Sequence, residues 1–82
     1  IINTASIIEH DNYIEDFVHI SPGVNLAGNV RVRSRSWVGI GSNVIQGVTI
    51  GSDTIIGAGS VVIKDIGEKK KAFGVPCKER QI

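Results

Sequence analysis

The 82-residue sequence predicts an all-β solenoid of short parallel strands, and three observations lead to this fold class. An aliphatic residue returns at every sixth position, without exception, from residue 2 to residue 62. The position two residues earlier is almost always small or β-branched, as suits strands, and glycine or another small residue often follows, as suits turns. The aliphatic positions are Ile2, Ile8, Ile14, Ile20, Leu26, Val32, Val38, Val44, Ile50, Ile56 and Val62.

A period of six excludes a helix, because it is a multiple of the strand period of two and not of the ~3.6 residues of a helical turn. Three hexapeptides, ~18 residues, would close one triangular coil, and the coils would stack at the inter-strand spacing of ~4.8 Å. The eleven hexapeptides span residues 2–67, a little under four coils. A small β-sandwich or barrel is the alternative, but it has no reason to keep one register over so many units.

The predicted solenoid covers residues 1–67, and residues 68–82 are expected to form a C-terminal tail. The segment EKKKAFGVPCKERQI breaks the register and contains Pro76, so we expect it to leave the prism. A thin solenoid leaves its sides exposed and its ends uncovered, which favours side-by-side association, most simply as a trimer. The sequence contains no methionine, so we expect a fragment, a domain or a processed product.

Composition narrows the classes of partner. The net charge of +1 argues against a general nucleic-acid binder, and no apolar run approaches the ~20 residues of a membrane span. A single cysteine excludes an internal disulfide and favours a cytoplasmic location. The lysine run 69–71 is either a solvated tail or an attractor for the phosphates of a ligand.

Both histidines lie in the stretch IIEHDNYIEDFVHI, and Asp11 directly follows His10. Residues 18 apart should be stacked neighbours, so His10 and His19, nine apart, should lie on roughly opposite sides of a coil. They are not expected to meet within one chain, and a shared site would lie between subunits. Trp37 should lie one coil beyond His19 on the same face, most simply packed in an interface.

Steps of 18 from His10 give a column of Gly28, Gln46 and Lys64, which an extended ligand in an inter-subunit groove would contact. Acyl transfer needs a base for the attacking amine or hydroxyl and an N–H that stabilises the oxyanion. His10 and the backbone N–H of Gly28 suit these roles, and Asp11 can orient the imidazole. The alternative interpretation of His10 and Asp11 is an exposed polar pair in a turn.

The segments NTASIIEHD, IEDFVHISPGVNLAGNV, GIGSNVIQGVTIG, IIGAGSVVIKDI and GVPCK resemble the bacterial acetyltransferases of nucleotide-linked 4-amino-sugars and the related sialic acid O-acetyltransferases. The likeness covers essentially the whole chain, and its most specific part is EHD followed by a second histidine and then AGN. The resemblance implies a hexapeptide-repeat, left-handed parallel β-helix, acetyl-CoA as acyl donor, a homotrimer and a nucleotide-linked sugar substrate.

The resemblance also implies roles for individual residues. His10 would be the general base, Asp11 would tune it, and Asn3 would touch the sugar. His19 and the backbone at Gly28 would lie against the thioester end of acetyl-CoA.

Further along the predicted column, the resemblance places Gln46 beside the pantetheine arm. Lys64 as a CoA contact follows from the stacking instead.

Two departures from this family stand out. Its members usually carry an N-terminal Rossmann-like domain that grips the nucleotide, and this sequence lacks it. Their tail usually reads Gly-x-Pro-Ala-Lys, and Cys77 replaces the alanine here. We expect an acetyl-CoA-dependent transferase acting on an amino or hydroxyl group of a sugar at a subunit interface, with the activity of this fragment alone left open.

Two other functions compete with acetyl transfer. A zinc enzyme of the γ-carbonic-anhydrase type uses the same prism, but it needs three protein ligands, and Asp11 would have to complete a set with the only two histidines. A non-catalytic β-helix that serves for trimerisation or as a scaffold is the other alternative for a chain without the nucleotide-binding domain.

Overall fold

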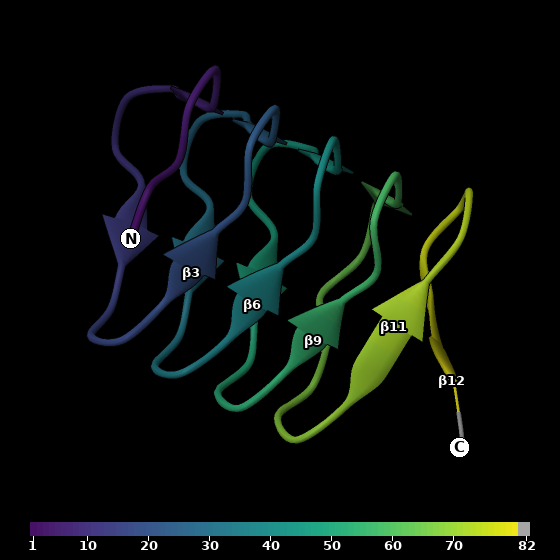
Figure 1. Ribbon diagram of the computed structural model, residues 1–82. Coiled ribbons are helices and arrows are strands. Elements are labelled where there is room, and N and C mark those ends of the chain that lie inside the picture. Colours follow the sequence, from purple (N-terminus) through teal and green to yellow (C-terminus); the bar gives the residue numbers. More distant parts are fainter. Residues whose placement is uncertain (81–82) are drawn as a thin grey trace.

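The computed structural model describes residues 1–80, which wind into a prism of stacked coils (Figure 1). In this part of the chain all regular elements are β-strands, which confirms the predicted all-β class, and no apolar helix of membrane-spanning length occurs. The strands are Ile7–Ile8 (β1), Tyr13–Ile14 (β2), His19–Ile20 (β3), Asn25–Leu26 (β4), Arg31–Val32 (β5), Trp37–Val38 (β6), Asn43–Val44 (β7), Thr49–Ile50 (β8), Ile55–Ile56 (β9), Val61–Val62 (β10), Lys71–Phe73 (β11) and Lys78–Arg80 (β12).

Three sheets form the sides of the prism, and we name each side after its first strand. The β1 side has the order β1-β4-β7-β10, the β2 side β2-β5-β8, and the β3 side β3-β6-β9-β11-β12. Strands of successive coils pair in parallel, as Ile7 does with Asn25 and Asn25 with Asn43. Asn25 and Asn43 are 18 residues apart, so three hexapeptides make one coil of the left-handed β-helix, as predicted.

The period-six aliphatic side chains form the core. Those from Ile20 to Val62 are at most 3% exposed, and each stacks on the equivalent residue of a neighbouring coil. Full burial of one such side chain contributes about 1.5–3 kcal/mol. Ile2 remains 52% exposed, and Ile8 and Ile14 are only partly buried, because the first coil is covered on one side alone.

A second inward column lies two residues before the first and carries the hydroxyl groups of the core. Its buried members are Val18, Val24, Val30, Ser36, Ser42, Val48, Thr54 and Ser60. The Thr54 hydroxyl donates to the Gly67 carbonyl at 2.7 Å, and the Ser36 hydroxyl accepts from the Thr54 N–H at 3.0 Å. Asn12, the one large polar residue in this column, accepts from the Val30 N–H at 2.6 Å. The polar residues therefore extend the hydrogen-bond ladder between coils.

Two-residue corners join the sides, and the second corner residue adopts a left-handed conformation. Glycine fills this place at Gly23, Gly41, Gly47 and Gly59. Asp11 (φ 60°) and Asn29 (φ 57°) fill it in the column of corners between the β1 and β2 sides. Asp and Asn tolerate this region better than most residues with a Cβ, so the sequence suits the turn geometry. His10 and Asp11 are therefore the two residues of one corner.

The last coil is two residues shorter than the others. Ile66 pairs with Ile50, 16 residues earlier, and Lys71 pairs with Ile55 at the same interval. The shortened corner brings the Asp65 carboxylate to the Thr49 N–H at 2.8 Å. One coil earlier, the equivalent N–H of Arg31 donates to the backbone carbonyl of Val48. A carboxylate thus replaces the carbonyl that the shorter coil does not supply.

The expectation that residues 68–82 leave the prism is wrong for the described part of this segment. After the short step the period of six resumes with Ile66 (4% exposed) and Ala72 (0%). Strand β11 continues the β3 side in parallel with β9, and β12 turns back antiparallel to β11 (Figure 1). Residues 81–82 lie outside the described residues, and the domain boundary at residue 67 stays a prediction.

Removal of the Asp65 side chain should destabilise the last coil. Asp65→Ala leaves the Thr49 N–H without its protein acceptor, and we expect the free energy of unfolding to fall by about 1 kcal/mol. Asp65→Asn keeps an accepting oxygen and should recover most of this loss. Chemical denaturation of the three proteins tests the effect, and equal losses in Asn and Ala variants would contradict it.

Candidate active site

His10 and Asp11 form the corner between β1 and β2, with His10 Nδ1 and Asp11 Oδ2 3.0 Å apart. An ionised carboxylate only accepts hydrogen bonds, so Nδ1 donates and the neutral ring carries its free lone pair on Nε2. The two side chains are 78% and 71% exposed. The corner therefore presents an oriented base that is open to solvent in the isolated chain.

Gly28 occupies the same corner one coil further and lies against the His10 ring. A Cβ on Gly28 would stand 3.4 Å from Cε1 and 3.7 Å from Nε2 of His10. The two corners are joined by a hydrogen bond from the Asn29 N–H to the His10 carbonyl. Within residues 1–80 no acceptor is found for the Gly28 N–H. Glycine thus keeps the space beside the imidazole clear and leaves a backbone donor next to it.

Gln46 and Lys64 lie on the same corner of the next two coils, and both are exposed. A groove of about 360 Å³ runs beside this column on the β1 side. Its lining includes Glu9, Ala27 and Ile45, each of which directly precedes a residue of the column. The remaining lining residues are Ile7, Asn25, Leu26, Asn43 and Val44. The structure therefore supplies a long surface along the predicted column.

A second hollow of about 290 Å³ lies where the column reaches the C-terminal segment. It is lined by Lys64, Asp65, Ile66, Cys77, Lys78 and Glu79. The position of Lys78 beside this column was missed by the sequence analysis, because the segment that carries it was expected to leave the prism. The sequence did contain a signal that the solenoid continues, because Ile66 and Ala72 are six residues apart and resume the aliphatic period.

The lysine run 69–71 lies elsewhere on the prism. The Lys69 N–H donates to the Ser52 carbonyl, which places Lys69 on the corner between the β2 and β3 sides. Lys71 lies in β11, on the β3 side. On a single chain, Lys64 and Lys78 are the lysines at the end of the His10 column.

A second polar group surrounds His19 on the β3 side. The Asn3 amide nitrogen lies 3.0 Å from His19 Nε2 and 3.2 Å from the Ile20 carbonyl oxygen. Trp37 lies on the face predicted for it, and its ring stacks on His19 with centroids 4.0 Å apart and planes 14° apart. The structure thus brings together Asn3 and His19 in one group, and His10, Asp11 and Gly28 in another. No hydrogen bond or ion pair joins these two groups among the described residues.

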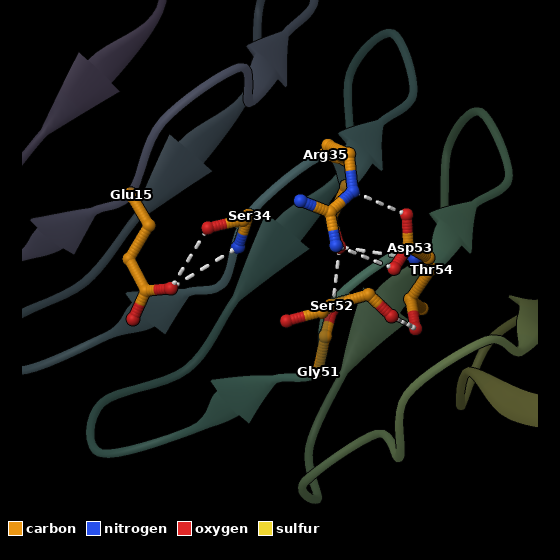
Figure 2. Close-up of polar contacts among 8 residues, drawn as sticks. Glu15, Ser34, Arg35, Gly51, Ser52, Asp53 and Thr54 are labelled. Atoms are coloured by element: carbon orange, nitrogen blue, oxygen red, sulfur yellow. Dashed lines mark hydrogen bonds and ion pairs between the residues drawn. The ribbon is translucent and has the colours of Figure 1, made fainter.

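The corner between the β2 and β3 sides differs in chemistry from the His10 corner. Arg35 forms two hydrogen bonds with Asp53, at 2.8 and 3.0 Å (Figure 2). The guanidinium holds the pKa of the Asp53 carboxyl below its ordinary value. Arg35 is exposed and Asp53 only half-buried, so the pair contributes little to stability. The carboxylate at this corner is thus engaged by an arginine, whereas the carboxylate at the His10 corner orients an imidazole.

The described residues include no cluster of three His, Cys, Asp or Glu side chains suited to a metal ion.

Comparisons with known proteins agree with the observed fold. Residues 29–64 match the family described as bacterial transferase hexapeptide (six repeats). The chain is similar to perosamine N-acetyltransferase from Caulobacter crescentus, solved as a variant with CoA and GDP-perosamine, at 42% identity and a TM-score of 0.96. It is also similar to the acetyltransferase domain of PglB from Neisseria gonorrhoeae, solved with acetyl coenzyme A, at 40% identity and a TM-score of 0.95.

The chain corresponds to only part of these proteins. The two matches cover 98% and 96% of this chain and 38% of each of the other chains. A Staphylococcus aureus protein named as an acetyltransferase is 46% identical over 63 residues, which make up 77% of this chain and 32% of that protein. The chain thus spans about a third of the length of the relatives that it matches.

Cys77 should be unreactive in the folded protein. Its side chain is 5% exposed, and burial raises the pKa of its thiol, so the nucleophilic thiolate is scarce at neutral pH. Alkylation by iodoacetamide, followed by mass spectrometry, should be slow at pH 7 and should become fast in urea. Equally fast modification with and without urea would contradict the burial.

Proposed function

We propose that the chain is a hexapeptide-repeat acyltransferase domain and forms the catalytic and CoA-binding part of an acetyl-CoA-dependent sugar acetyltransferase. One observation carries the proposal: His10 is held by Asp11 with Nε2 free, beside the open backbone of Gly28. A base and an oxyanion donor are the two groups that direct acetyl transfer requires.

The reaction follows from this arrangement. His10 Nε2 takes a proton from the acceptor amine or hydroxyl as its nitrogen or oxygen attacks the thioester carbonyl. The Gly28 N–H donates to the oxygen that becomes negative in the tetrahedral intermediate. The carbon–sulfur bond then breaks, and the proton on Nε2 passes to the CoA sulfur. Asp11 stabilises the transient imidazolium and keeps the ring in one orientation.

Acetyl-CoA would lie along the His10 column. Gln46 offers an amide to the pantetheine arm, and Ala27 and Ile45 in the adjoining groove offer apolar contact. Lys64 and Lys78 at the far end of the column would meet the phosphates as point charges. His19 is proposed to lie against the thioester end from a neighbouring copy of the chain. The CoA and acetyl-CoA complexes of the similar proteins support this donor.

A neighbouring copy would also cover the base. The high exposure of His10 and Asp11 leaves them in water, where a general base is poorly shielded. Exposed apolar residues favour packing of the β1 and β3 sides: Ile7, Ile45 and Ile63 near the first, and Trp37 and Ile55 on the second. The β2 side is polar instead, with the Arg31 guanidinium 5.1 Å above the Tyr13 ring. We therefore propose a homotrimer with each site between two chains.

The acceptor is proposed to be an amino or hydroxyl group of a nucleotide-linked sugar. The Caulobacter crescentus protein, solved with GDP-perosamine, supports this class. Selection of the sugar would depend largely on the part of the relatives that lies outside this match. Asn3, which the resemblance places against the sugar, would contribute at most its carbonyl oxygen, because its amide nitrogen is engaged by His19 and Ile20.

CoA binding by this chain tests the donor site. In calorimetric titration, Lys64→Gln/Lys78→Gln should weaken CoA affinity about five- to tenfold, as expected for loss of two exposed ion pairs. The matched control Arg31→Gln/Arg33→Gln removes the same charge from the β2 side, which lies outside the proposed interface, and should bind as the unaltered chain does. Equal weakening of CoA affinity in both variants would indicate a general effect of net charge and would contradict a specific phosphate contact of Lys64 and Lys78. If the unaltered chain does not bind CoA at millimolar concentration, the non-catalytic scaffold function is the remaining alternative.

Turnover by the full-length parent protein tests the base. His10→Ala should lower kcat about 10²- to 10⁴-fold, the range for loss of general-base catalysis, and should leave CoA affinity nearly unchanged. Asp11→Asn keeps an acceptor for Nδ1 and should lose less. Near-normal turnover of nucleotide-linked amino-sugars by the His10→Ala protein would show that His10 is not the base.

A further inference from the structure

The polar contacts on the β3 side repeat from one coil to the next. The Asn3 side chain bonds to the ring of His19, and the Ser21 side chain bonds to the ring of Trp37; both partners are 16 residues apart. Asn3 and Ser21 occupy equivalent places on successive coils, as do His19 and Trp37. A polar side chain on one coil therefore holds an aromatic ring on the next, and the two rings stack on each other.

The contacts of Asn3 determine which nitrogen of His19 carries the proton. The Ile20 carbonyl oxygen only accepts, so the part of the Asn3 amide that faces it at 3.2 Å is the NH₂ group. The same nitrogen lies 3.0 Å from His19 Nε2 and has a second hydrogen to donate. Nε2 must therefore accept, and the proton of the neutral ring lies on Nδ1.

Trp37 determines the plane of the same ring. Its indole lies 4.0 Å from the imidazole and nearly parallel to it, and its Nε1–H donates to the Ser21 hydroxyl at 3.0 Å. Ser21 is 3% exposed, so this anchor is fixed in the body of the prism. The stack holds the imidazole against rotation about its side-chain bonds.

We propose that Asn3 and Trp37 are positioning residues that hold His19 as a hydrogen-bond donor through Nδ1, directed at an acyl or amide carbonyl oxygen of the acyl donor. The proposal rests on the proposed function, because it takes acetyl-CoA as the ligand of His19. Within residues 1–80 His19 Nδ1 has no acceptor, so its N–H remains available for a ligand. A histidine fixed in this tautomer donates to a carbonyl without a change of protonation.

This role for Asn3 differs from the sugar contact that the resemblance implies. If Asn3 contacted the sugar, its replacement would raise the KM for the acceptor and would leave the affinity for the acyl donor unchanged. A positioning residue acts through His19, so its loss would weaken acetyl-CoA binding even in the absence of acceptor.

Nitrogen-15 NMR of the 82-residue chain reads the tautomer directly. With two histidines in the sequence, His10→Gln assigns the His19 signals. We expect the proton on Nδ1 in the unaltered chain. Asn3→Ala should shift the population toward the Nε2–H form, and Asn3→Asp should shift it further, because a carboxylate accepts from Nε2–H. Ser21→Ala, the matched control one coil further, should leave the tautomer of His19 unchanged.

Calorimetry with acetyl-CoA then tests whether the tautomer is used. Asn3→Ala and Trp37→Ala should each weaken binding about fivefold, as expected for one misdirected hydrogen bond. Trp37→Phe, which keeps an aromatic face, should recover most of the affinity. Circular dichroism shows whether each variant retains the fold.

Each outcome decides a separate point. An Nε2–H tautomer in the unaltered chain, or no shift in Asn3→Ala, overturns the role of Asn3. The expected tautomer with unchanged acetyl-CoA affinity in Asn3→Ala and Trp37→Ala overturns their positioning role but leaves the proposed function intact. Absence of acetyl-CoA binding by the unaltered chain refutes the proposed function, whereas the NMR result on the tautomer still stands.

Discussion

The stacking of one aliphatic side chain on the next, at 18-residue intervals inside the prism, is the constraint on which the rest of the structure depends. Ile20, Val38 and Ile56 stack in this way and are fully buried, so each coil depends on its neighbours for its core. The same register sets the backbone ladder between coils. A shift of one residue would turn every inward side chain outward, which explains why the pattern tolerates so little variation.

The register also determines where the candidate functional residues lie. Corners are the points where a side chain need not pack into the core, and the 18-residue interval aligns the corners into columns. His10 and Gly28 are neighbours because they occupy one column, although they are remote in sequence. The same logic produces the repeated contacts on the β3 side, where Asn3 holds His19 and Ser21 holds Trp37. The candidate site is therefore a product of the repeat, with functional residue types at a few of its positions.

The C-terminal segment shows how such a repeat can change its length without losing its core. The chain omits two residues at the last corner, and the Asp65 carboxylate takes over the hydrogen bond of the missing carbonyl. The inward positions then resume with Ile66 and Ala72. This step brings Lys78 beside Lys64 at the end of the candidate CoA path.

The amino-acid sequence by itself determined the fold class, the coil length and the column of His10, because all three follow from a period that local residue types reveal. It did not reveal the course of residues 68–80. Four residues instead of six separate Val62 from Ile66, which hid the return of the period, and only the parallel pairing of β11 with β9 in the structure shows that the solenoid continues. The tautomer of His19 and the plane set by Trp37 were also beyond the sequence. The spacing of residues in the sequence predicts which of them share a face of the prism. The direction of a hydrogen bond, in contrast, depends on where atoms of separate coils meet in three dimensions.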